Sequence, residues 1–154
     1  MTRKLAVFGA VLALGAMMLG TTLTGASAGT GEEIQFRAIT TESGFVDVGE
    51  KGTSLGDEFI FHDVLKHAGE KVGHDGGVCT VTSVRGPESQ CLVTGYLSGG
   101  QITLQGLSKD TGKLPVEFVF AVTGGTGQYQ GASGEAHVVV KSDTVARVTI
   151  QLEA

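Results

Sequence analysis

Beyond residue 28, the chain consists of short runs of β-branched and aromatic residues that alternate with turn-forming residues, and no run repeats every 3.6 residues as an amphipathic helix would. This pattern is typical of strands joined by turns, and it restricts the domain to an all-β fold. We expect eight strands, which cover residues 33–41, 57–66, 71–82, 89–98, 101–107, 116–123, 135–141 and 144–152.

The connections between these runs predict how the strands pair. Most of the connections are too short for anything but antiparallel neighbours. The short connections are residues 67–70, 84–87, 98–100 and 142–143. Only the connection at residues 42–56, which is rich in glycine and acidic residues, is long.

Eight consecutive antiparallel strands predict an up-and-down β-barrel, which closes on itself and leaves no exposed edge strand. A β-sandwich is the alternative. Glycines inside or at the ends of strands, such as Gly95 and Gly106, favour the barrel because its strands must coil sharply. A closed barrel of this size has room for its own side chains or for one small ligand.

The stretch VEFVFAVTGGTGQYQGASG, at residues 116–134, is an apolar strand followed by a glycine-rich turn. Both faces of the strand are apolar, which indicates a buried strand. A phosphate-binding loop is the competing interpretation of the glycines, but the segment contains no lysine and no helical pattern follows it. We therefore interpret the glycines as a tight connection at the rim of the barrel.

The first 28 residues have the pattern of a secretory signal peptide. Arg3 and Lys4 precede an uncharged apolar run at residues 5–19, and the small residues Ala26 and Ala28 stand where a signal peptidase cleaves. We therefore expect a signal peptide at residues 1–28 and a single secreted barrel domain at residues 29–154. Neither a second apolar run long enough to span a membrane nor a lipid-accepting cysteine near the cleavage site is present, so we expect no membrane attachment after cleavage.

The charge of the chain argues against nucleic acid as a partner. The whole sequence has a net charge of −5, and removal of the expected leader takes away two basic residues and no acidic one. An acidic domain with dispersed lysines and arginines repels a phosphate backbone. A basic or zwitterionic protein surface, or a neutral small molecule, remains open as a partner.

The two cysteines, Cys79 and Cys91, lie in consecutive predicted strands at equal distances from Arg85, so a simple hairpin places them opposite each other. In an oxidising compartment this arrangement predicts a disulfide. The competing interpretation is a reactive thiol in a cavity, which needs a positive neighbour to lower its pKa, and the nearby sequence offers none.

The densest group of metal-capable side chains comprises His62, Asp63, His67, His74 and Asp75. On a strand His62 and Asp63 point to opposite faces, and His67 lies in a turn, so we expect no metal site.

Two acidic residues stand among apolar neighbours, and they are the candidate catalytic groups. Asp63 shares its strand face with phenylalanines and Leu65, and Glu117 shares its face with Val119 and Ala121. A carboxyl inside an apolar barrel has a raised pKa suited to proton transfer. The alternative for each is a solvated outward residue or a salt bridge to a basic side chain, for which the candidates are Lys66, Arg37 and Arg147.

Three segments in this order carry a family resemblance: GDEFIFHDVLKHAGEKVGHDGGVC at residues 56–79, ITLQG at residues 102–106, and FVFAVTGGTGQYQGASGEAHV at residues 118–138. Together they resemble the allene oxide cyclase family and the related dirigent proteins. The resemblance implies an eight-stranded barrel that encloses a hydrophobic cavity, and it implies that three such barrels often assemble into a trimer. It also implies chemistry that needs no cofactor, in which the barrel directs the stereochemistry of a reactive substrate.

The chain departs from the cyclases at positions that matter for their reaction. In the resemblance, the glutamate and the asparagine of the first cyclase strand correspond to Ala38 and Thr40. The asparagine of the second strand corresponds to Asp63, and the cavity cysteine corresponds to Cys79. The family fold is therefore expected, and the epoxide chemistry of the plant enzymes is not.

Our leading hypothesis is a secreted barrel that binds one small hydrophobic molecule and directs its cyclisation or coupling, with Asp63 and Glu117 as the candidate acids. The expected ligand-binding walls are Phe59, Phe61, Phe118 and Phe120. A carrier without chemistry is the second hypothesis, because the same cavity serves both purposes. The third is a protein-interaction module whose barrel is filled by its own side chains.

Overall fold

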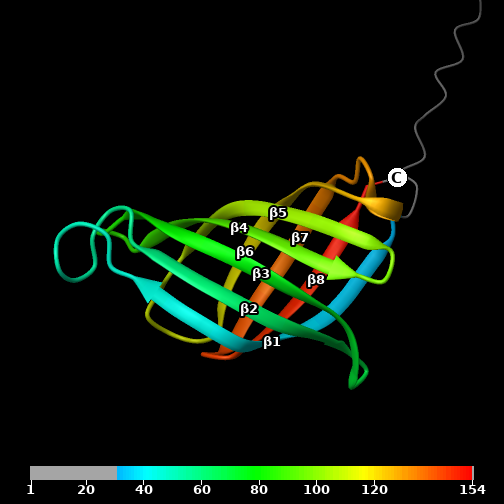
Figure 1. Cartoon of the computed structure of the whole chain (residues 1–154), viewed down its shortest axis with the longest axis horizontal. Helices are drawn as coiled ribbons and strands as arrows, with labels where there is room; N and C mark the ends of the chain where they lie inside the picture. The colour runs from blue at the N-terminus through cyan, green and yellow to red at the C-terminus, as the bar shows by residue number, and fades with distance from the viewer. Residues whose placement is uncertain (1–30, 154) are drawn as a thin grey trace, which may run out of the picture.

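The computed structural model describes residues 31–153, and they form one closed β-barrel of eight antiparallel strands in which each strand pairs with its neighbours in the sequence. The last strand pairs with the first and closes the sheet, which confirms the up-and-down barrel and excludes the sandwich (Figure 1). The strands are β1 Glu33–Val46, β2 Glu58–His67, β3 Glu70–Ser83, β4 Glu88–Leu97, β5 Gly100–Lys109, β6 Val116–Gly125, β7 Gly134–Ser142 and β8 Val145–Leu152. The signal peptide expected at residues 1–28 lies outside the described residues.

Seven of the eight strands begin and end within two residues of the ranges expected from the sequence, and β1 is the exception. It continues five residues further, to Val46, because β2 extends far enough to pair with it there, with Phe45 opposite Phe59. A register shift between Thr40 and Glu42 marks a bulge in β1. Before the bulge, the even-numbered residues of β1 up to Thr40 point inward. After it, the odd-numbered residues do, so Phe45 lies on the inner face of the sheet beside Phe59.

The remaining long connection, residues 47–57, is held together by the buried carboxylate of Asp57. The backbone amides of Val48 and Ser54 donate hydrogen bonds to this carboxylate at 2.8 and 2.7 Å. These bonds lower the pKa of Asp57, because a carboxylate that accepts backbone hydrogen bonds is stabilised in its ionised form. The loop therefore has a fixed attachment beside the start of β2.

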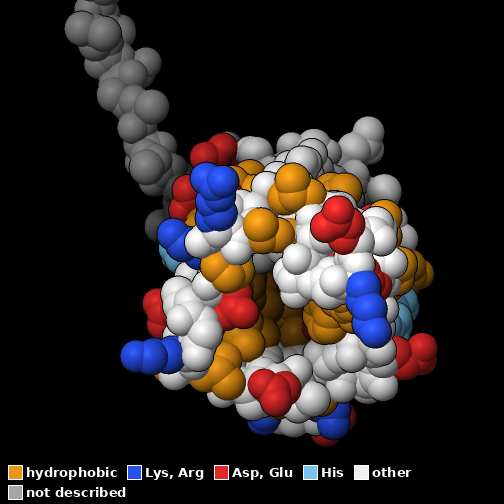
Figure 2. Space-filling view, turned by 90° about the vertical axis from the view of Figure 1, so that its left-hand side faces the viewer, with side chains coloured by type: hydrophobic (Ala, Val, Ile, Leu, Met, Phe, Trp, Pro, Cys, Tyr) orange, Lys and Arg blue, Asp and Glu red, His pale blue; other side chains and the backbone are white. Residues whose placement is uncertain are grey.

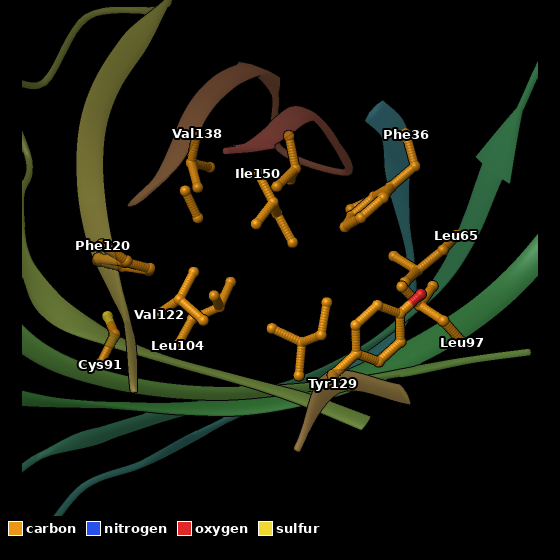
Figure 3. Close-up of a cluster of buried hydrophobic side chains, with 14 residues drawn as sticks. Phe36, Leu65, Cys91, Leu97, Leu104, Phe120, Val122, Tyr129, Val138 and Ile150 are labelled. Atoms are coloured by element: carbon orange, nitrogen blue, oxygen red, sulfur yellow. The ribbon is translucent and has the colours of Figure 1, made fainter. Parts of the chain in front are cut away.

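The core fills the end of the barrel that carries the β2–β3, β4–β5 and β6–β7 connections. Side chains from all around the sheet point inward there (Figure 3). The short 3-10 helix η1, Gly127–Tyr129, lies in the glycine-rich β6–β7 connection and places the buried side chain of Tyr129 against Leu65, Leu97 and other core residues. The glycine-rich segment is thus the rim connection expected from the sequence, and it closes this end of the barrel.

Strand β6 differs from its expectation as a strand buried on both faces. Its inner face is buried, with Phe120 and Val122 in the core, but Val119 on its outer face is 46% exposed. The outer surface of a single-layer barrel is covered only where another element packs on it, and no helix covers β6 within the described residues. No helix of the described part of the chain is long and apolar enough to cross a membrane.

Candidate functional site

The lumen is not filled by side chains. It contains a cavity of about 250 Å³, whose lining reaches from Phe36 and Leu97 near the closed end to Ser142 and Asp143 at the β7–β8 turn. Figure 2 looks into the open end of the barrel, where the β7–β8 turn lies, and shows a hollow with hydrophobic side chains along its depth. The presence of this hollow distinguishes the protein from a barrel whose lumen is completely filled by its own side chains.

All four expected ligand-binding phenylalanines line this cavity. Phe59 and Phe61 on β2 are stacked with ring centroids 5.9 Å apart, and Phe118 and Phe120 on β6 lie 4.9 Å apart. In a closed ring of eight strands, β2 and β6 are four positions apart and therefore face each other across the lumen. The two aromatic pairs thus form opposite walls of the cavity. Phe59 is the more exposed member of its pair, with 43% of its surface accessible to solvent.

Two aspartates lie deeper in the same cavity. Asp63 on β2 is directly opposite Asp75 on β3 in the strand register, and the two side chains are only 7% and 6% exposed. The row continues on both sides, because Thr40 is opposite Asp63 and Gly95 is opposite Asp75. All four residues of the row line the cavity, and Gly95 leaves free space beside Asp75 because it has no side chain.

The aspartate pair favours its protonated form. Burial raises the pKa of Asp63, and this effect is opposed by hydrogen bonds with Thr40 and Asp75 and by the nearby His62. Burial, together with the adjacent Asp63 carboxylate, raises the pKa of Asp75 to about 7. Two carboxyl groups held together away from water cannot both ionise at low cost, so below neutral pH the pair retains a proton.

Sequence reasoning singled out Asp63 but did not select Asp75 as a site residue. From the sequence, Asp75 is only one member of the group of metal-capable side chains. The structure divides this group between the two faces of the sheet, with His62 and His74 stacked on the outer face at a centroid distance of 5.5 Å. In the part of the chain that the structure describes, no three histidine, cysteine or acidic side chains form a metal-binding group.

Glu117, the other candidate acid, does not reach the cavity. The neighbouring Phe118 lines the lumen, and side chains alternate along a strand, so Glu117 points outward and is exposed. Of the alternatives that the sequence left open for this residue, the structure matches the solvated outward position.

The predicted disulfide is present. Cys79 on β3 and Cys91 on β4 are paired in the register and joined by a disulfide, and both line the cavity. The Oγ atom of Ser108 lies 3.4 Å from the Sγ atom of Cys91. The thiol interpretation is therefore wrong for this structure, because no described cysteine is free.

Gly77 shapes the aromatic wall. It lies opposite Phe61 in the register, and a Cβ atom added to it would overlap the Phe61 ring. We therefore expect Gly77→Ala to displace this ring and to weaken the binding of N-phenyl-1-naphthylamine, a neutral apolar fluorescent probe, by up to about tenfold, the equivalent of one lost aromatic contact. Fluorescence titration measures the change.

Gly76→Ala is the matched control for this variant, because an added Cβ atom there would lie 3.8 Å from the Phe61 carbonyl oxygen, an ordinary contact. It should bind the probe as the unmodified protein does. Equal binding by both variants would show that the Phe61 ring does not form a binding wall.

Comparison with known proteins agrees with this architecture. The model of the allene oxide cyclase barrel-like domain matches residues 32–152. The chain belongs to this family. All four positions at which the resemblance located the cyclase site, Ala38, Thr40, Asp63 and Cys79, line the cavity of this family member.

Among solved structures, the chain is similar to pyocyanin demethylase, with 30% sequence identity and a TM-score of 0.71, over 79% of this chain and 99% of the other. An exo-specific intermolecular Diels–Alderase has 18% identity and a TM-score of 0.64, over 80% and 100% of the two chains. A pterocarpan synthase dirigent protein has 19% identity and a TM-score of 0.62, over 79% and 94%. The last two likenesses show a shared fold. No curated protein sequence matches the chain significantly.

Proposed function

We propose that this protein is a secreted barrel that binds one small, mainly apolar molecule in its lumen and isomerises or cyclises it by proton transfer, without a cofactor. The observation that carries this proposal is the buried Asp63–Asp75 pair inside a cavity with aromatic walls. Perturbed acids in an apolar pocket are the usual mark of a site that moves protons.

The pair has the two components that an isomerisation needs. Asp75 holds a proton that it can give to one atom of the substrate, and Asp63 in its ionised form can accept a proton from another atom. The proton then passes from Asp63 to the adjacent Asp75, so the protein returns to its starting state and the substrate keeps its composition. General acid–base catalysis of this kind contributes roughly a hundredfold or more when the groups are in reach of the reacting atoms.

The phenylalanine walls contribute by restricting the conformation of the substrate. A molecule held between Phe61 and Phe118 has fewer accessible shapes than in water, which brings its reacting atoms closer to the geometry of the transition state. The names of the similar proteins support small-molecule chemistry in such a lumen, because they include a demethylase and a Diels–Alderase.

Native mass spectrometry of the protein purified from its own culture medium tests this proposal. We expect the processed chain with a retained small molecule. On incubation, that molecule should be converted to an isomer, which has the same mass and is resolved by its chromatographic retention time, at a rate at least tenfold lower in Asp63→Asn, because the variant cannot accept the proton. Val93→Phe, which places a ring in the cavity, should abolish binding.

Three outcomes would contradict parts of this proposal. A ligand recovered unchanged after long incubation would indicate a carrier, the second function that this cavity can serve. A product lighter by one CH₂ group would indicate demethylation, as the name of the similar demethylase suggests. An Asp63→Asn protein with the unmodified rate would exclude Asp63 from the reaction.

The same measurement tests a homotrimer, which we propose as the assembled form. The outer faces of β4, β5 and β6 expose large apolar side chains, Leu92, Leu107 and Val119. Exposed apolar residues gathered on adjacent strands are typical of a surface that another subunit covers. Val119→Lys should then yield monomers, and a monomeric unmodified protein would overturn the trimer.

A further inference from the structure

The charge of the cavity restricts its ligand. Among the described residues that line the cavity, the charged side chains are Asp63, Asp75 and Asp143, and none is a lysine, arginine or histidine. An anionic ligand would therefore be repelled, and its desolvated charge would find no partner. This excludes carboxylates such as fatty acids and favours a molecule that is cationic or rich in hydrogen-bond donors.

The aspartate pair also has unused acceptor atoms. The Oδ1 atoms of Asp63 and Asp75 are buried, and neither has a hydrogen-bond partner within the described protein. A buried carboxyl oxygen without a partner costs free energy, and native proteins rarely leave one unsatisfied unless it has a catalytic role or a ligand, an ion or water uses it. Two such oxygens on adjacent strands, both in side chains more than nine-tenths buried, form a two-point acceptor for a donor group on a ligand.

The shape of the cavity adds a third restriction. The phenylalanine pairs on β2 and β6 face each other, which favours a flat aromatic molecule between them. Ring faces also attract cations when water is excluded. The walls and the acidic pair thus favour the same kind of molecule.

We propose that the lumen selects a flat aromatic molecule with a protonated ring nitrogen or an aromatic amine, whose N–H groups donate hydrogen bonds to Asp63 and Asp75. This inference rests on the proposed function, because it names the ligand class of the same cavity. The bound cation takes the place of the proton on the aspartate pair, so binding releases that proton. For such a cationic substrate, the proton that Asp75 gives to the reacting atom is the ligand's own N–H proton, which first passes to the pair, so the ligand keeps its composition and the pair returns to its starting state.

The groups around the pair determine the pH dependence of binding. Thr40 faces it from β1 and Gly95 from β4, and neither titrates. Asp143 stands at the open end, and His62 on the outer face lowers the pKa of Asp63 by its charge. Because burial raises the pKa of Asp75 to about 7, the affinity for a permanent cation should rise between pH 6 and pH 8 as the pair loses its proton.

Three fluorescent tricyclic probes of similar shape test this inference: 9-aminoacridine, which is a cation at neutral pH, 9-anthracenemethanol, which is neutral, and 9-anthracenecarboxylate, which is an anion. We expect the cation to bind at least tenfold more tightly than the neutral probe and the anion to bind weakest. In an Asp63→Asn/Asp75→Asn variant, the ratio of the affinities for the cation and the neutral probe should fall to less than about threefold. Val93→Phe should weaken all three.

Calorimetry of 9-aminoacridine binding to the unmodified protein, in two buffers with different ionisation enthalpies, measures the released proton without any variant. Release of a proton near pH 6.5 supports the inference, and no release overturns it. Equal affinities for the three probes, all lost in Val93→Phe, would overturn the ligand class and leave the proposed function standing. Binding of no probe, or binding that Val93→Phe does not change, would overturn both.

Discussion

Replacing Asp75 by asparagine is expected to stabilise the protein above pH 7 and to remove most of the pH dependence of its stability between pH 4 and pH 7. Burial and the adjacent Asp63 carboxylate raise the pKa of Asp75 from 3.8 to about 7. The folded protein therefore holds a proton that the unfolded chain releases at a lower pH. An asparagine forms the hydrogen bonds of a protonated aspartate but has no proton to lose.

The direction in which the free energy of unfolding changes with pH follows from the number of protons that Asp75 binds in the folded and unfolded states. Below about pH 4, Asp75 is protonated in both states and has no effect on stability. Between pH 4 and pH 7 the folded state binds more protons than the unfolded state, so the free energy of unfolding falls by up to about 1.4 kcal/mol per pH unit. Above the folded-state pKa, Asp75 is ionised in both states, and the free-energy cost of burying its charge no longer changes with pH. The stability gained by Asp75→Asn is therefore largest there.

Urea unfolding of both proteins at several pH values measures this difference. Asp143→Asn is the matched control, because Asp143 is the same type of residue and also lines the cavity but is exposed. It should leave the pH profile unchanged. A parallel profile for Asp75→Asn and the unmodified protein would mean that Asp75 is ionised in the folded state at ordinary cost, and the shared proton would be excluded.

Removal of the Cys79–Cys91 disulfide is expected to lower the free energy of unfolding by about 3 kcal/mol. The bridge closes a loop with a sequence separation of 12 residues, and its main effect is to restrict the unfolded chain. For a domain of this size, the loss corresponds to a fall in Tm of roughly 10 °C. Thermal unfolding of Cys79→Ala/Cys91→Ala measures it.

Reduction of the unmodified protein separates the bridge from the packing of its sulfur atoms. Cys91 is almost fully buried, so the alanine variant also loses contacts that the reduced protein keeps. Reduced unmodified protein should therefore be slightly more stable than the double variant, and reductant should not affect the variant. A Tm that is unchanged by reduction would show that the bridge restricts a chain already ordered before folding.

The local sequence was sufficient for the strands and for what each strand face carries. Short runs bounded by turn residues predicted all eight strands, since the alternation of side chains and the chemistry of turns are properties of a few neighbouring residues. The same alternation correctly placed Asp63, Phe59 and Phe61 on one face of β2, which the structure turns into the lumen. It could not say which face of β6 is the inner one, and Glu117 was proposed for that reason.

The disulfide was also predictable, because the connection between β3 and β4 is short and the two cysteines are placed evenly about it. The partner of Asp63 was not. Counted back from the tight turn that joins β2 and β3, where His67 pairs with Glu70, an unbroken register would place His74 opposite Asp63. The register shifts after Leu65, and this irregularity brings Asp75 into the lumen and turns His74 outward.

The sequence by itself thus determined an all-β barrel, its disulfide and an aspartate among phenylalanines, since these follow from periodicity and from contacts across one short turn. Only the tertiary structure decided that a second carboxyl stands beside Asp63 and that Phe118 and Phe120 face Phe59 and Phe61 across a cavity. Both depend on how the sheet closes and where its register shifts. Closure is a property of all eight strands together, and no single segment encodes it.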